Sequence, residues 1–158
     1  MKLARTIRLD ESDSNVFELA AESGEWAISG GFEFSNWTED DLTGKRRQAF
    51  ANGWLSLDSF GRATFVSVTK IEPAELEALV EELAGHFVRY YGAPDLDAAR
   101  GVAKDEIAYM RELCEEHEIN TLLAVSREMT DGGIKEQFRF IEVADADIEM
   151  IAVHVTPD

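Results

Sequence analysis

Two consecutive helices are predicted for residues 73–118, PAELEALVEELAGHFVRYYGAPDLDAARGVAKDEIAYMRELCEEHE. Pro73 suits the first position of a helix, and apolar residues then recur at helical spacing on one face. Residues 92–94, Gly-Ala-Pro, end this first helix, and an aspartate that follows can cap a second one running to about Glu118. The apolar face of the first helix comprises Leu76, Leu79, Val80, Leu83, Phe87, Tyr90 and Tyr91.

Segments with strand patterns lie on both sides of this helical pair. The first half of the chain is predicted to be an antiparallel meander, because Asn52-Gly53 is a strong two-residue hairpin signal and residues 58–61 form a second turn. The pair Gly30-Gly31 lies inside a predicted strand, where it suggests a bulge or a close approach of two backbones.

The order of elements, strands then two helices then strands, favours an α+β fold for residues 1–158 as a single domain. We expect a mainly antiparallel sheet of about 7–8 strands with the two central helices packed on one face. The predicted strands cover residues 3–9, 26–34, 45–51, 54–57, 62–71, 119–129, 134–143 and 148–155.

Length and composition are those of one globular domain. The 158 residues are 45% hydrophobic, which excludes a generally disordered chain. The only cysteine, Cys114, cannot form an internal disulfide, and this favours the cytoplasm. The apolar runs are only a few residues long, whereas a helix that spans a membrane needs about 20. We therefore expect a soluble, cytoplasmic protein.

The charge balance is strongly acidic, because 15 basic residues against 32 acidic ones give a formal net charge of −17. Nucleic-acid binding depends on Lys and Arg that neutralise phosphates, so we expect no nucleic-acid partner. An anionic membrane surface is disfavoured for the same reason. The charge is compatible with a basic protein partner, although solubility alone also explains it.

The second predicted helix carries Glu106 and His117 within the arc of its apolar face. They are about 16 Å apart along the axis and cannot contact each other. One interpretation makes Glu106 an acid or base that lines a pocket. The other gives it a structural arginine partner, while His117 interacts with the helix dipole. The arginines considered as partners of Glu106 are Arg5, Arg89 and Arg139.

Cys114 and His117 are also candidates as a pair, because they could act as zinc ligands or as an activated thiol and its base. A structural zinc site needs four ligands, usually with paired cysteines, and this chain has one Cys and three His. A buried Cys that packs as a small apolar residue is the simpler interpretation. We expect no metal and no cofactor, since the fingerprints of phosphate loops, dinucleotide sites and nucleophile elbows are missing from the sequence.

Aromatic residues near the predicted hairpins are candidate binding residues, above all Phe60 and Trp54, together with Tyr109 on the second helix. Exposed together, they would form a protein-binding surface, whereas pointing inward they belong to the core. Phe60, at a turn, is expected to protrude. The basic run 45–47, Lys-Arg-Arg, could bind a phosphate, a carboxylate or an acidic partner, or could protect an edge strand by its charge.

Residues 24–30 (GEWAISG), 48–53 (QAFANG) and 59–61 (SFG) together resemble an uncharacterised family of small acidic bacterial proteins, a domain of unknown function. The resemblance covers most of the chain and includes no catalytic motif. It implies a bacterial cytoplasmic protein and supplies no activity, cofactor or site residue.

Two functions from different classes stay open, and the sequence does not decide whether the protein is an enzyme. The first, which the absence of catalytic motifs favours, is a non-catalytic accessory or protein-interaction domain that docks on a larger partner, with a homodimer also possible. The second is a small-molecule-binding domain or enzyme with a pocket between the helices and the sheet, lined by Glu106 and by Cys114, His117 or Tyr109. A polar-lined cavity at that interface would favour the second, and a solid core the first.

Overall fold

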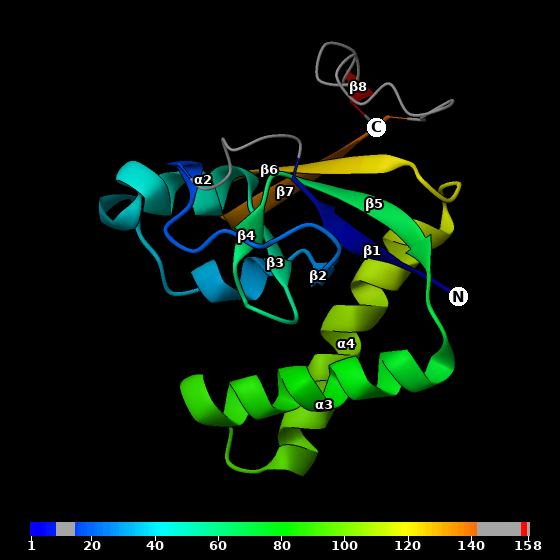
Figure 1. Cartoon of the computed structure of the whole chain (residues 1–158). Coiled ribbons are helices and arrows are strands. Elements are labelled where there is room, and N and C mark those ends of the chain that lie inside the picture. The colour runs from blue at the N-terminus through cyan, green and yellow to red at the C-terminus, as the bar shows by residue number, and fades with distance from the viewer. Residues whose placement is uncertain (9–14, 142–155, 158) are drawn as a thin grey trace.

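The computed structural model describes residues 1–8, 15–141 and 156–157, and shows a curled antiparallel sheet with helices packed against it (Figure 1). Eight strands pair in the order β4-β3-β2-β1-β5-β6-β7-β8. The α+β fold predicted from the sequence is confirmed. The strands are β1 (Lys2–Ile7), β2 (Trp26–Ile28), β3 (Trp54–Ser56), β4 (Arg62–Ala63), β5 (Phe65–Lys70), β6 (Leu122–Thr130), β7 (Gly133–Ile141) and β8 (Thr156–Pro157).

The two central helices are α3 (Pro73–Tyr90) and α4 (Leu96–Glu115), which pack against each other on one side of the sheet (Figure 1). Asp95 caps α4, because its Oδ1 accepts a hydrogen bond from the Ala98 backbone N–H at 2.8 Å. α4 also packs on β1, the strand at the centre of the sheet. Its buried residues are Ala99, Ala103, Ile107, Met110 and Cys114.

The basic segment after residue 43 is a helix, α2 (Gly44–Asn52), so the strand predicted there is wrong, as is the Asn52-Gly53 hairpin. Lys, Arg, Gln and Ala all favour helix, and the helix buries Phe50 while its basic side chains face solvent. Gly53 follows in an extended conformation with φ −92°, which is not the positive φ that such a hairpin turn needs. Asn52 instead donates its side-chain N–H to the Val125 carbonyl at 3.1 Å, which ties α2 to β6.

The strand predicted for residues 26–34 is also shorter than expected, since it ends at Ile28 and a 3₁₀ helix, η1 (Gly31–Phe34), follows. Gly30 has φ +73°, and a Cβ on it would lie 2.4 Å from Leu55 Cβ. The Gly30 backbone therefore lies close to the Leu55 side chain, and the glycine pair follows the strand instead of lying inside it. The positive φ of Gly30 makes a left-handed turn, which ends the strand before η1.

At the C-terminal end, β6 and β7, which match the strands predicted for residues 119–129 and 134–143, form an antiparallel hairpin with Thr130 paired to Gly133. The last predicted strand, residues 148–155, lies outside the described residues. Among the residues that the structure describes, no helix is long and apolar enough to span a membrane.

Candidate functional site

A pocket of about 520 Å³ opens between α4, η1 and β7. The pocket lies between a helix and the sheet beside Glu106, the position for which a pocket was predicted from the sequence. Its function stays a prediction. The pocket is polar and acidic on one wall and aromatic on another. Its lining residues are Ser29, Gly31, Phe32, Asp105, Glu106, Tyr109, Ile134 and Glu136.

Glu136 is held by three hydrogen bonds from side chains of other elements. Its Oε2 accepts hydrogen bonds from Arg127 Nε at 2.7 Å and from Ser29 Oγ at 2.6 Å. Its Oε1 accepts a third from the Tyr109 hydroxyl at 3.2 Å. Partial burial, together with the nearby Glu136 charge, raises the pKa of Tyr109 to about 12, so that this hydroxyl stays protonated and donates.

Glu106 is held in a different way, because the structure shows no hydrogen bond or ion pair to its carboxylate from the described residues. Burial raises the pKa of Glu106 above its ordinary value, and the charges of Glu136 and Asp105 raise it further. The arginines considered as its structural partners do not fill that role: Arg5 pairs with Glu75 at 3.8 Å, while Arg89 lies over a tyrosine ring. Arg139, on β7, forms no ion pair with Glu106 in the described part of the chain.

Behind the pocket lies Arg127, whose side chain is fully buried in β6. Besides its bond to Glu136, it donates to the backbone carbonyls of Ser29 at 2.6 Å, Gly53 at 2.9 Å and Phe50 at 3.0 Å. This set of acceptors satisfies a charge that would otherwise be costly to bury. Arg127 therefore connects the pocket wall to the C-terminal end of α2.

A second buried arginine, Arg62, shares these carbonyls. It donates to the Gly53 carbonyl at 3.0 Å and to the Gly30 carbonyl at 3.2 Å, and it forms an ion pair with Glu33. The guanidinium carbons of Arg62 and Arg127 lie 4.6 and 5.3 Å from the ring centre of Phe34. Burial lowers the pKa of Arg62 to about 10, although the Glu33 charge opposes this, so both arginines remain cationic at neutral pH.

Neither arginine was predicted from the sequence, although the pattern of β6 contains a signal for Arg127. Along β6 the apolar residues Leu123 and Val125 alternate toward the interior, and Arg127 is the next position in that series. A charge at an inward position of a strand indicates a buried polar network. Nothing in the sequence identifies the acceptors of that charge, because they come from distant segments.

Cys114 and His117 are joined by a backbone hydrogen bond, in which the His117 N–H donates to the Cys114 carbonyl at 3.1 Å. Cys114 is buried in the core, and burial raises the pKa of its thiol to about 12, which leaves it protonated and unreactive. His117 follows the end of α4, where its ring lies 4.9 Å from that of Phe140. Across the described ranges 1–8, 15–141 and 156–157, no group of three or more His, Cys, Asp or Glu is arranged to hold a metal ion.

The hairpin aromatics are placed inward. Trp54 is fully buried and stacks on Phe138 with ring centres 5.6 Å apart, so it cannot reach a partner directly. Phe60 does not protrude as expected, because its ring stacks on His86 at 3.8 Å and packs against the core. Tyr109 is the most exposed of the three predicted binding residues, with 46% of it exposed, whereas Phe60 is half-buried.

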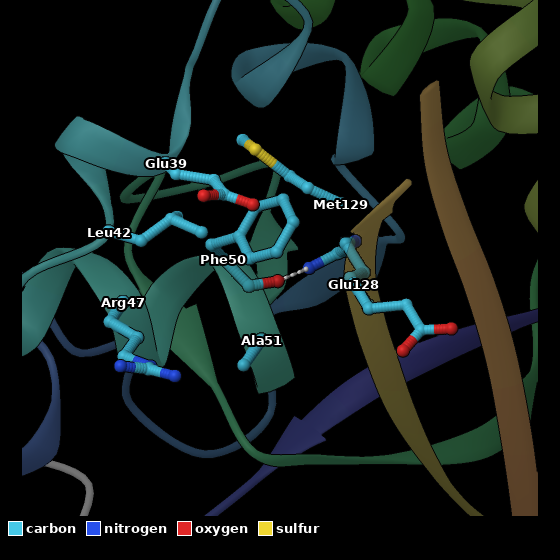
Figure 2. Close-up of a pocket in the computed structure, with 8 residues that line it drawn as sticks. Glu39, Leu42, Arg47, Phe50, Ala51, Glu128 and Met129 are labelled. Carbon is cyan, nitrogen blue, oxygen red and sulfur yellow. Dashed lines mark hydrogen bonds between the residues drawn. The ribbon is translucent and has the colours of Figure 1, made fainter. Parts of the chain in front are cut away.

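A further pocket, of about 460 Å³, lies between α2 and β6. Figure 2 shows that Arg47 and Glu128 direct their charged groups away from Phe50, which occupies its centre. Arg127 also lines this pocket and donates to the Phe50 carbonyl at 3.0 Å. This pocket offers no convergent polar groups, so the Glu106 pocket is the better candidate site.

The Glu106 pocket is acidic, because Asp105 and the unpartnered Glu106 line it together with Glu136, which Arg127 holds. No curated protein and no solved structure matches this chain. The sequence profile of one family, described as a family of unknown function, matches residues 1–158. The chain therefore belongs to the family DUF6505, as the resemblance of its glycine-rich and aromatic segments implied.

Proposed function

We propose that the protein binds a small organic cation, an amine or a guanidine carrying a compact apolar group, in the Glu106 pocket. The observation that carries the proposal is the half-buried Glu106 carboxylate, which has no partner among the described residues. A buried, unpaired carboxylate costs free energy, and a bound cation would offset that cost.

Acidic lining alone would not support this function, because a chain with 32 acidic residues forms acidic surfaces by chance. Glu136 and Glu106 differ in what surrounds them. The charge of Glu136 is matched by Arg127 at 2.7 Å, whereas that of Glu106 is not matched. Of the three acids in the lining, Asp105 is exposed and Glu136 is paired, so Glu106 is the half-buried carboxylate whose charge a bound cation would neutralise.

The aromatic wall supports a ligand with an apolar part. Phe32 and Tyr109 both line the pocket with Glu106. A cation beside an aromatic face gains about 0.5–2 kcal/mol from the ring quadrupole. The Tyr109 ring is held in place by its hydroxyl bond to Glu136 at 3.2 Å, so this surface is formed before the ligand arrives.

Benzylamine and benzyl alcohol are matched probes for this site, since they have similar shapes and only the amine is charged. We expect benzylamine to bind saturably in calorimetric titration and benzyl alcohol to bind about tenfold more weakly or not at all. Glu106→Gln should weaken benzylamine binding by about tenfold, because it removes the charge and keeps the shape.

The matched control is Glu112→Gln, the same substitution at an exposed position of the same helix. This substitution removes one negative charge, as Glu106→Gln does, but Glu112 lies outside the pocket lining. Equal losses in the two variants would show that the amine responds only to the overall acidity of the protein, and the proposal would then be wrong. The absence of saturable benzylamine binding would also reject it.

A second candidate, the accessory or protein-interaction domain, is favoured by the apolar surface at the end of α3. Tyr90 is 66% exposed, and Leu19, which lines a pocket with Tyr90, is 56% exposed. Exposed apolar residues grouped in this way suit a protein interface. Native mass spectrometry tests this in its simplest form, a homodimer: Tyr90→Asp should shift a dimer to monomer, and a wild type that is monomeric at all concentrations would contradict it.

We also propose a cytoplasmic location, which is supported by the buried, free thiol of Cys114. Fractionation of cells that express the protein tests this proposal.

A further inference from the structure

The structure changes the interpretation of the basic run Lys45-Arg46-Arg47. It is not a charged edge strand, because it forms the first turns of α2. Successive residues of a helix point about 100° apart, so the three cations cannot serve one site equally. Lys45 and Arg46 line one pocket, whereas Arg47 lines the separate pocket of Figure 2.

The pocket beside Lys45 and Arg46 has a volume of about 290 Å³ and lies between α2, η1 and the β3–β4 turn. This volume suits a compound of one or two rings. Its walls are unusually aromatic, since flat side chains from five separate positions line it. These are Phe17, Phe34, Trp37, Phe60 and Tyr91.

The walls are also largely rigid. Phe34 packs edge-to-face on Trp37 with ring centres 4.8 Å apart, and Phe60 is stacked on His86. Tyr91 donates its hydroxyl to Glu33, the carboxylate that also pairs with Arg62. A pocket formed by held rings loses little entropy when a flat ligand enters it.

The charge of this pocket is the reverse of the charge of the whole chain. Its lining holds the cations Lys45, Arg46 and Arg62 against two acids, within a chain of net charge −17. Arg62 is only 7% exposed and is already matched by Glu33. Lys45 has no ion pair with any described residue, so its ammonium group is available to a ligand.

Arg46 is placed over the aromatic wall. Its guanidinium carbon lies 4.5 Å from the ring centre of Trp37, and its contact with Asp41, at 3.4 Å, is a long one between exposed groups. A guanidinium held over a ring in this way can donate to an anion at the edge of the same ring.

From these observations we propose that this second pocket binds a planar aromatic carboxylate. The rings of the ligand pack among the aromatic walls, and its carboxylate lies between Lys45 and Arg46 at the rim. The site is separate from the Glu106 pocket and selects the opposite charge.

Titration with 2-naphthoate tests the proposal, with 2-naphthalenemethanol as the neutral probe of the same shape. We expect saturable naphthoate binding at least about fivefold tighter than that of the alcohol. The double variant Lys45→Gln/Arg46→Gln should weaken naphthoate binding by about tenfold and leave binding of the alcohol unchanged. Both substitutions are at exposed helical positions, so the variant is expected to fold.

Arg47→Gln is the matched control, because it removes the third charge of the same run outside this pocket, and it should leave naphthoate binding within about twofold of wild type. Glu106→Gln should leave it unchanged as well, which separates this test from that of the proposed function. Equal loss in Arg47→Gln, equal affinity for acid and alcohol, or no saturable binding of naphthoate would each overturn the proposal.

Discussion

The ionised side chain of Glu106 lowers the stability of the folded protein, because its surroundings disfavour the charge. Burial and the nearby charges of Glu136 and Asp105 raise its pKa above the value in the unfolded chain. At a pH below the unfolded-state pKa the group is protonated in both states and its ionisation costs nothing. As the pH rises through the folded-state pKa, the folded protein must ionise Glu106 in an unfavourable place, and stability is lost.

Glu106→Gln should therefore stabilise the protein at neutral pH and have little effect at acidic pH. We expect the free energy of unfolding at pH 7 to rise by up to about 1 kcal/mol, with the gain disappearing toward pH 4. Urea unfolding of both proteins across this pH range measures the difference. A gain that did not depend on pH would show that packing, and not ionisation, is responsible.

The same substitution is expected to weaken benzylamine binding, so at this one residue stability and binding change in opposite directions. A residue that lowers stability in the empty protein and strengthens binding is typical of a functional site. Arg127 differs from Glu106 in this respect, because its buried charge is matched by Glu136 and by three backbone carbonyls.

At the scale of the elements, Gly30 is the residue that separates β2 from η1. Alanine at this position would be strained at φ +73°, and its Cβ would also collide with Leu55, 2.4 Å away. We expect Gly30→Ala to lower the free energy of unfolding by about 3 kcal/mol or more. Gly44→Ala separates the two causes, because Gly44 has φ +55° with open space around it and should cost only about 1 kcal/mol. Equal effects in chemical denaturation would exclude the collision.

The elements also show why sequence reasoning succeeded in some places and failed in others. α3 and α4 were predictable because their apolar faces, the Pro73 start and the Asp95 cap all agree. α2 was not, because Asn52-Gly53 matches a hairpin turn equally well. Only the tertiary bond from Asn52 to β6 and the close packing around Gly53 distinguish the two outcomes.

The same division applies to the sites. Glu106 was predictable as an unusual position, since helical spacing alone places it beside an apolar face. Its pocket was predictable only in outline, because Glu136 and Phe32 come from elements far apart in the chain. The arginine pair could not be predicted as a pair, since β4 and β6 are separated in the sheet by four strands.

At the scale of the whole molecule, the two proposed sites are joined through buried charge. Arg127 holds the Glu136 wall of one pocket, and Arg62 holds Glu33 at the base of the other. Both donate to the Gly53 carbonyl, at 2.9 and 3.0 Å, which fixes the end of α2 between them. The fold thus places the two proposed sites on either side of one buried hydrogen-bond network.

The net charge of −17 acts on the stability of the entire chain. With 32 acidic and 15 basic residues, acids repel one another in the compact state, whereas the ion pairs between exposed side chains contribute little. The buried pairs Arg62–Glu33 and Arg127–Glu136 are shielded from salt. Screening therefore weakens mainly the repulsion, and we expect the Tm to rise by about 4 °C when NaCl is raised from about 0.01 M to about 0.5 M. KCl should act equally if screening is the cause, and a Tm that falls with salt would show that attractive surface pairs dominate instead.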